Sequence, residues 1–333
     1  MTSTFKTITL FSIFGFILHL YSCTEPSVTD LNSREAVEKL LESDPLNPEA
    51  LHARAKLHIR NSESDSALID AIHAIEQDSS KSEYFITLGD IYLIKNQTRF
   101  TRQALEKAIK LSPDSKNAHM KLAELFLYVE MRQEAINEIN EVLKRDKTNP
   151  KAYYLKGIIY KESGDTALAI SSFLTTVEQD PNYLLAYEQL GLVFSASGNP
   201  RAINFYETAI KLDPKNSLTR YNLGMYYQDN GNPEKAVEVF KELVKLDPAF
   251  ANAHYNLGYL AIEEDKDYAS AIEHFKSAEI ANPSYAAAVY MQGVCFEKMN
   301  KQSEAVKLYQ KSIQIDPRFS LGREGLIRLG AAK

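Results

Sequence analysis

Apolar and polar positions along this chain recur with a period of about 34 residues. Seven two-residue steps that end in proline interrupt the pattern at regular places: Asp44-Pro45, Ser112-Pro113, Asp180-Pro181, Asp213-Pro214, Asp247-Pro248, Asn282-Pro283 and Asp316-Pro317. Ser79 and Lys147 stand at two further proline positions, so the successive spacings are 34, 34, 34, 34, 33, 34, 35 and 34. Because the residue before a proline avoids the α region, each step predicts the end of a helix. A fixed period of this length is typical of a stacked repeat protein.

Two series of small residues follow the same period. The first is Ala55, Gly89, Ala123, Gly157, Gly191, Gly224, Gly258 and Gly293, and the second is Ala67, Thr101, Ala135, Ala169, Ala202, Ala236, Ala271 and Ala305. The series lie 12 residues apart, except 11 in the fifth segment and 13 in the seventh. Since turns absorb length changes and helices do not, a turn is expected between them. Phe240 and Leu243 lie four and seven positions after Ala236. This spacing of apolar residues predicts the buried stripe of a second helix.

The segment RYNLGMYYQDNGNPEKAVEVFKELVKLDP, at residues 220–248, resembles the tetratricopeptide repeat (TPR). On this resemblance the chain divides into eight repeats within 48–319: 48–81, 82–115, 116–149, 150–183, 184–216, 217–250, 251–285 and 286–319. Residues 33–47 and 320–333 then form an N-terminal and a C-terminal capping helix. The resemblance implies an all-α fold, an α-solenoid in which about eight helix-turn-helix repeats form a right-handed superhelix. It also implies a concave groove lined by the first helices.

The motif YNLG occurs at 221–224 and again at 255–258. If its leucine faces the core, helical spacing turns the residues before it toward the groove, together with residues one turn further on. Tyrosine and amide side chains suit an extended peptide, because rings supply contact area and amides pair with backbone groups. The expected peptide-binding residues are therefore Tyr154, Gln189, Tyr221, Asn222, Gln228, Tyr255, Asn256, Tyr259 and Tyr290. The alternative is that these residues are simply what an average TPR carries.

A net charge of −6 over 333 residues argues against binding to nucleic acid. The groove positions lack the paired lysine and arginine with which some TPR domains grip a C-terminal carboxylate. No catalytic motif, cofactor motif or metal-ligand spacing is present, and Cys295 is expected to be a buried, unreactive thiol. We therefore expect a non-catalytic scaffold that binds a protein or peptide. The alternatives are a homodimer or other homo-oligomeric subunit of an envelope assembly or secretion machine, and an unrecognised glycan-processing enzyme.

The N-terminal segment MTSTFKTITLFSIFGFILHLYSC has one basic residue, an apolar stretch of about 13 residues, and then Leu20-Tyr21-Ser22-Cys23. This ending resembles a bacterial lipobox, which implies a lipoprotein signal peptide at 1–22 and acyl chains on Cys23. Residues 23–32 would form the lipidated start and a tether. Thr24 after the cysteine favours a lipoprotein of the outer membrane, facing the periplasm or the cell surface. An ordinary cleaved signal and an uncleaved anchor are the alternatives.

Two short segments, Asp65-Ser66-Ala67 and Asp165-Thr166-Ala167, resemble an O-glycosylation motif of secreted bacterial proteins. Both aspartates also stand where a helix would start, and aspartate is a preferred N-cap residue. We favour the capping interpretation. Asn232 before Pro233 is expected to cap another second helix in the same way.

Overall fold

A computed structural model describes residues 31 and 33–331. The signal peptide, Cys23 and most of the predicted tether lie outside the described residues. Within the described part all regular structure is α-helical, so the predicted all-α fold is confirmed. The chain divides after Pro113 into two compact units, and each is described by itself.

Unit 1 contains a single helix followed by two helix pairs. The helices are α1 (Arg34–Ser43), α2 (Pro48–Arg60), α3 (Ser64–Gln77), α4 (Ser82–Ile94) and α5 (Thr98–Leu111). Ser33 caps α1 by accepting a hydrogen bond from the backbone N–H of Ala36 (3.2 Å). Val37 and Leu41 of α1 pack on Leu51 of α2, so α1 covers the apolar face that the first pair would otherwise expose.

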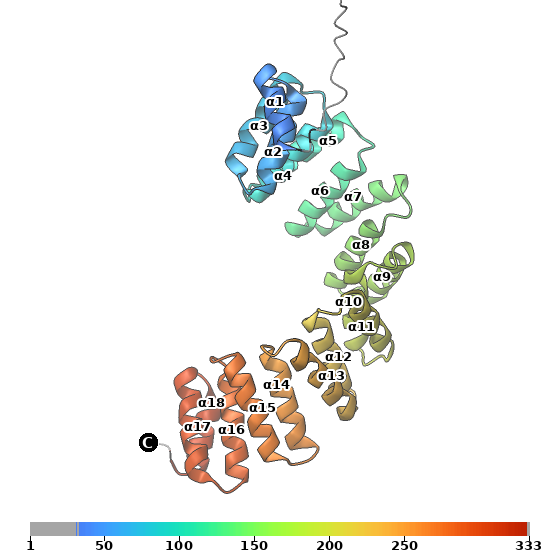
Figure 1. Cartoon of the computed structure of the whole chain (residues 1–333). Helices are drawn as coiled ribbons and strands as arrows, with labels where there is room; N and C mark the ends of the chain where they lie inside the picture. Colours follow the sequence, from blue (N-terminus) through green and yellow to red (C-terminus); the bar gives the residue numbers. More distant parts are fainter. Residues whose placement is uncertain (1–30, 32, 332–333) are drawn as a thin grey trace, which may run out of the picture. The chain divides into compact units, whose positions relative to one another are not determined.

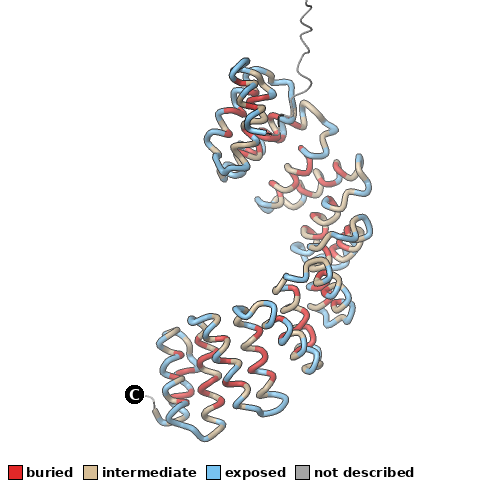
Figure 2. The backbone as a smooth tube through the Cα atoms, in the orientation of Figure 1, coloured by how far each residue is buried: buried red, intermediate tan, exposed pale blue. Residues whose placement is uncertain are grey.

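Unit 2 contains six helix pairs and a final single helix. The helices are α6 (Lys116–Tyr128), α7 (Arg132–Arg145), α8 (Pro150–Glu162), α9 (Thr166–Gln179), α10 (Leu184–Ser195), α11 (Arg201–Leu212), α12 (Ser217–Asp229), α13 (Pro233–Leu246), α14 (Ala251–Glu263), α15 (Tyr268–Ala281), α16 (Ala286–Lys298), α17 (Gln302–Ile315) and α18 (Ser320–Arg328). Each helix packs on its neighbours in the sequence, as α14 to α18 show in Figure 1. Buried residues run along the inside of each pair (Figure 2).

Within each pair, the two helices approach most closely at the glycine or alanine of the first small-residue series, which lies on the first helix of the pair. A Cβ atom added to Gly224 on α12 would come within 2.5 Å of Phe240 Cε1 on α13. The same close approach joins Gly157 to Phe173 and Gly258 to Phe275. A missing side chain on the first helix therefore makes room for an aromatic ring on the second.

The capping predictions had mixed outcomes. Asp165 caps α9, because its Oδ1 accepts a hydrogen bond from the backbone N–H of Leu168 (3.1 Å). For Asp65 the prediction was wrong: α3 already begins at Ser64, with Glu63 as its N-cap residue. Asp65 lies within the first turn and forms an ion pair with Lys95, the C-cap residue of α4. Asn232 occupies the N-cap position of α13 as predicted, but its side chain makes no capping hydrogen bond.

Candidate functional site

The first-helix face of unit 2 carries the predicted tyrosines, and each of the four at the YNLG position is wedged between two other rings. Tyr255 on α14 lies 5.3 Å, centroid to centroid, from Phe275 on α15 and 5.2 Å from Tyr285, which precedes α16. Such separations are favourable for aromatic pairs. The same arrangement surrounds the other three: Tyr154 with Phe173 and Tyr183, Tyr221 with Phe240 and Phe250, and Tyr290 with Tyr309 and Phe319. These tyrosines are half-buried and join one repeat to the start of the next.

In one repeat, hydrogen bonds take the place of the ring contacts around the tyrosine position. We call this position, between one repeat and the start of the next, the slot. Glu188 on α10 stands at the tyrosine position, and Asn216 stands where the following aromatic would be. Glu188 Oε1 accepts hydrogen bonds from Asn216 Nδ2 (2.7 Å) and from Thr219 Oγ1 on α12 (2.6 Å). Asn216 also caps α12 through the backbone N–H of Thr219 (3.0 Å). The exchange of both partners together indicates that the slot is a junction between neighbouring repeats.

The predicted amide residues divide into bonded and unbonded groups. Asn256 is buried, and its Nδ2 contacts Met225 Sδ on α12 at 2.8 Å. Gln189 accepts a hydrogen bond from Lys161 Nζ on α8 (2.6 Å). Gln228 Oε1 is buried and has no hydrogen-bond partner among the described residues. Asn222 is half-buried. The described part of the chain therefore leaves one buried amide oxygen, that of Gln228, without a donor.

Exposed apolar side chains lie on three first helices of this face. Leu185 and Leu192 on α10 are 49% and 40% exposed, Leu218 on α12 is 61% exposed, and Tyr259 on α14 is 38% exposed. Met225 is half-buried at the position of α12 that corresponds to Leu192. We call these five residues the apolar ladder. The pairs Leu185/Leu192 and Leu218/Met225 are each seven residues apart, which places both members on one helix face.

Sequence reasoning named Tyr259 but missed the three leucines. A usable signal was present, since the leucines lie six residues before or one residue after the small residue of their repeat. Those two positions share a face with the YNLG tyrosine. The signal was obscured because leucine in a repeat helix is ordinarily a core residue.

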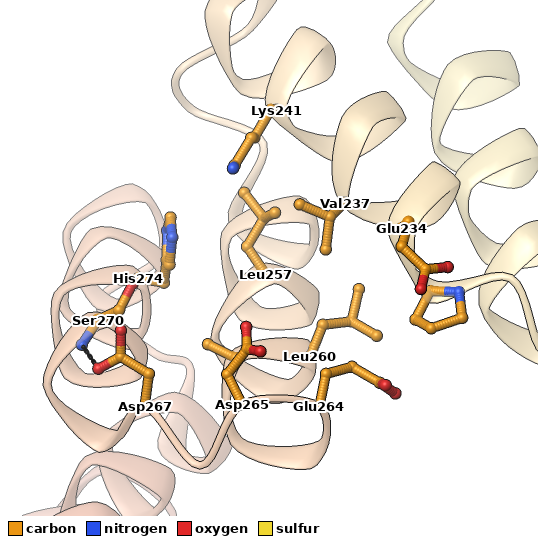
Figure 3. A pocket seen from close by; sticks show the side chains of 12 residues that line it. Glu234, Val237, Lys241, Leu257, Leu260, Glu264, Asp265, Asp267, Ser270 and His274 are labelled. Carbon is orange, nitrogen blue, oxygen red and sulfur yellow. Dashed lines mark hydrogen bonds between the residues drawn. The ribbon is translucent and has the colours of Figure 1, made fainter.

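A cavity of about 430 Å³ opens on the other side of the solenoid, among α13, α14 and α15. Figure 3 shows Val237, Leu257 and Leu260 on its walls, with the carboxylates of Glu264 and Asp265 at one side. Asp267 Oδ1 accepts the capping hydrogen bond of Ser270 (3.0 Å). This cavity lies beside the seventh repeat, whose extra residue is in the α14–α15 connection.

The described residues hold no cluster of histidine, cysteine, aspartate and glutamate suited to a metal ion. Cys295 is fully buried on α16, and burial raises the pKa of its thiol to about 12. The thiolate required for nucleophilic attack is therefore scarce at neutral pH. No described helix is both long and apolar enough to cross a membrane.

Two family models, each described as Tetratricopeptide repeat, match the chain, one at residues 221–285 and 265–318 and the other at 150–183. The structure is similar to the C-terminal part of a TPR repeat-containing protein from Cytophaga hutchinsonii, with a TM-score of 0.63, 19% identity and coverage of 72% of this chain and 98% of that one. A tetratricopeptide repeat protein from Parabacteroides merdae gives a TM-score of 0.52 at 16% identity, covering 76% and 99%.

Two curated proteins are similar over part of their length. The BBSome complex member BBS4 of Bos taurus is 27% identical over 146 residues, which is 42% of this chain and 27% of that protein. Its Drosophila melanogaster homolog is 24% identical over 119 residues, 35% of this chain and 24% of that protein. The chain thus matches only about a quarter of these relatives. Together with the helix pairs that recur about every 34 residues, these findings show that the chain is an α-solenoid that carries tetratricopeptide repeats.

Proposed function

We propose that this protein is a non-catalytic adaptor that binds a segment of a partner protein on the first-helix face of unit 2. The observation that carries the proposal is the apolar ladder on α10, α12 and α14. Contiguous exposed apolar groups mark interaction surfaces, because leaving them in water is unfavourable. TPR proteins generally act as protein-interaction scaffolds, which supports the same function.

The half-buried tyrosines fit this function in a supporting role. Their rings are held by neighbouring aromatic residues, so they offer a rigid rim beside the ladder. A tyrosine phenol is neutral at physiological pH, and burial raises the pKa of Tyr221 and of Tyr255 further. A rigid, neutral rim costs little conformational entropy when a partner binds.

A site-specific cross-linking experiment in native membranes tests the adaptor function. The full chain carries a photo-reactive amino acid at position 222, beside Tyr221, with and without the double substitution Leu185→Ser/Leu218→Ser. We expect one or a few discrete adducts in the unsubstituted protein and their loss in the double variant. The matched control is Leu168→Ser/Ile280→Ser, which removes two exposed apolar side chains from second helices of the same unit. Adducts that survive in the ladder variant, or that vanish equally in the control, contradict the proposal.

We also propose that the protein is tethered to a bacterial membrane, and to the outer membrane in particular, through acyl chains on Cys23. The support comes from the sequence alone: Leu20 three residues before the cysteine and Ser22 directly before it. Two or more acyl chains anchor a protein stably, whereas one binds only marginally. Cys23→Ser is expected to abolish fatty-acid labelling of the protein and to release the protein from the membrane fraction. Labelling that persists in this variant contradicts the anchor.

Self-association is a second candidate function, favoured by one observation at the end of unit 2. Ile327 on α18 lies 34 residues after Gly293 and so takes the small-residue position of a first helix. In each full repeat the second helix covers this position, but Ile327 is 66% exposed. Light scattering of the full chain in detergent measures this directly. A monomer at all concentrations excludes it, and a dimer that dissociates on Ile327→Glu supports it.

A further inference from the structure

Among the lysine, arginine and carboxylate side chains of the three ladder helices, those that lie on the ladder face are all negative. Together α10, α12 and α14 contain three carboxylates, Glu188, Asp229 and Glu263, and one basic residue among lysine and arginine, Arg220. Arg220 faces the second helices, since its Nη1 donates to Pro214 O (3.1 Å) and its Nε lies 3.9 Å from Glu242. No guanidinium or ammonium group of these three helices therefore lies on the ladder face.

Two of the carboxylates lie beside the tyrosine rim. The pKa of Tyr154 is raised first by burial and then by the negative charge of Glu188. The pKa of Tyr221 is raised mainly by burial, and the charge of Asp229 adds to this. A carboxylate can act on a phenol in this way only when the two groups are near each other. Glu188 occupies the tyrosine position of α10, and Asp229 and Glu263 lie four residues after Met225 and Tyr259, which places all three carboxylates on the ladder side of their helices.

Among the residues that the structure describes, no cationic side chain forms an ion pair with these carboxylates. The hydrogen bonds to Glu188 come from neutral groups, the Asn216 amide and the Thr219 hydroxyl. Asp229 and Glu263 are exposed at the C-terminal ends of α12 and α14. Lys161, on the preceding first helix, donates to the Gln189 amide. Helix C-termini also carry partial negative charge, which adds to the negative potential at Asp229 and Glu263.

We propose that the ladder face selects a segment that combines apolar side chains with lysine or arginine. This inference rests on the proposed function and specifies the chemistry of its partner. The apolar side chains cover Leu185, Leu192 and Leu218, and the cationic side chains lie against Glu188, Asp229 and Glu263. An acidic segment, or a free C-terminal carboxylate, meets like charge there and is disfavoured.

Fluorescence polarisation with three labelled, end-capped peptides tests this inference on the full chain in a neutral detergent, with empty micelles as baseline. In the first peptide leucine alternates with lysine. The second carries glutamate in place of each lysine, and the third carries serine in place of each leucine. We expect the leucine–lysine peptide to bind most tightly. Raising the salt concentration should weaken its binding, because salt screens exposed charges.

Substitutions locate the charge effect. Asp229→Asn/Glu263→Gln removes two negative charges with little change in shape. It is expected to lower the affinity for the leucine–lysine peptide by roughly threefold to tenfold. The matched control is Glu264→Gln/Asp265→Asn, which removes two charges from the cavity on the other side of the solenoid and is expected to change binding by less than about twofold.

The outcomes separate the two proposals. Equal binding of the lysine and glutamate peptides, with both lost in Leu185→Ser/Leu218→Ser, overturns the charge preference while the face still binds peptides. Failure of all three peptides to bind also overturns this inference, and the cross-linking experiment then decides the adaptor function independently. An equal effect of the control substitutions shows that net charge, and not this face, governs binding.

Discussion

Gly224 of α12 lies directly against the ring of Phe240 on α13, and a Cβ atom at residue 224 would come within 2.5 Å of Phe240 Cε1. Alanine stands at the equivalent position in two repeats, and there the second helix carries a smaller residue: Ala71 opposite Ala55, and Ile139 opposite Ala123. Glycine faces an aromatic ring in five of its six repeats and Leu105 in the other, whereas neither alanine faces a ring. This pairing explains why glycine, which costs about 1 kcal/mol relative to alanine inside a helix, recurs there.

Gly224→Ala is therefore expected to destabilise unit 2 by about 1 kcal/mol or more. Overpacking of this kind costs about 1–3 kcal/mol, and the better helix propensity of alanine offsets only part of it. The double variant Gly224→Ala/Phe240→Ile reproduces the natural pair of the third repeat. We expect it to be more stable than the sum of the two single changes predicts, by about 1 kcal/mol, as measured from urea midpoints. Strict additivity would show that the two positions do not compete for the same space.

Tyr255→Ala is expected to lower stability by about 2 kcal/mol, because it removes the ring that lies between Phe275 and Tyr285. Tyr255→Phe keeps the ring and is expected to change stability by less than about 0.5 kcal/mol. Thermal unfolding followed by circular dichroism compares the two. If alanine proves as harmless as phenylalanine, the ring contacts contribute little. Partner-binding tests should use the phenylalanine variant, because it removes the hydroxyl group of Tyr255 without disturbing the fold.

Arg54 in unit 1 forms a buried ion pair from a position that is leucine in most other repeats. Its Nε and Nη2 donate to Asp70 Oδ2 (2.7 Å) and Oδ1 (2.8 Å), and Asp70 is nearly inaccessible to solvent. Asp70→Ala leaves Arg54 with only the longer ion pair to Glu38 (3.4 Å). Because the Arg54 side chain is 28% exposed, we expect a loss of about 3 kcal/mol, the lower end of the range for a broken buried pair. Arg54→Leu/Asp70→Ala should recover much of this loss, because no buried charge remains. Urea unfolding of the four forms measures the coupling, and a double variant as unstable as Asp70→Ala contradicts the explanation.

The stability of unit 1 is expected to fall in mild acid because of His52. Its ring accepts or donates a hydrogen bond with Thr87 Oγ1 (2.8 Å) and packs on Tyr84. Burial, aided by the charge of Lys56, lowers the pKa of His52 to about 4. An unfolded histidine titrates near pH 6.5. Between these values the unfolded chain binds more protons, so stability is complete above about pH 6.5 and decreases toward pH 4, by up to roughly 3 kcal/mol.

His52→Gln, which keeps a hydrogen-bonding group, is expected to flatten this dependence. The measurement is the urea midpoint of the α1–α5 transition at pH 7 and at pH 4.5. His73→Gln on the exposed side of α3 is the control and should leave the difference between the two pH values intact. A wild-type midpoint that does not change with pH contradicts the prediction.

The sequence by itself determined the repeat period, the helix pairs and the place of the turns, because prolines, glycines and small residues impose local backbone constraints that a regular period makes visible. The burial of Cys295 followed from its place beside Gly293 in a helix that packs on both neighbours. These features depend on short stretches of chain, so one sequence suffices to predict them.

Only the tertiary structure decided which side chains meet across repeats. It showed that the YNLG tyrosines are held between rings from two other segments, that Asn256 is buried against Met225, and that Leu185 and Leu218 face solvent. It also moved the start of α3 ahead of Asp65, and it divided the chain after Pro113. Helical periodicity assigns a residue to a face, but whether that face is covered depends on helices far away in the sequence.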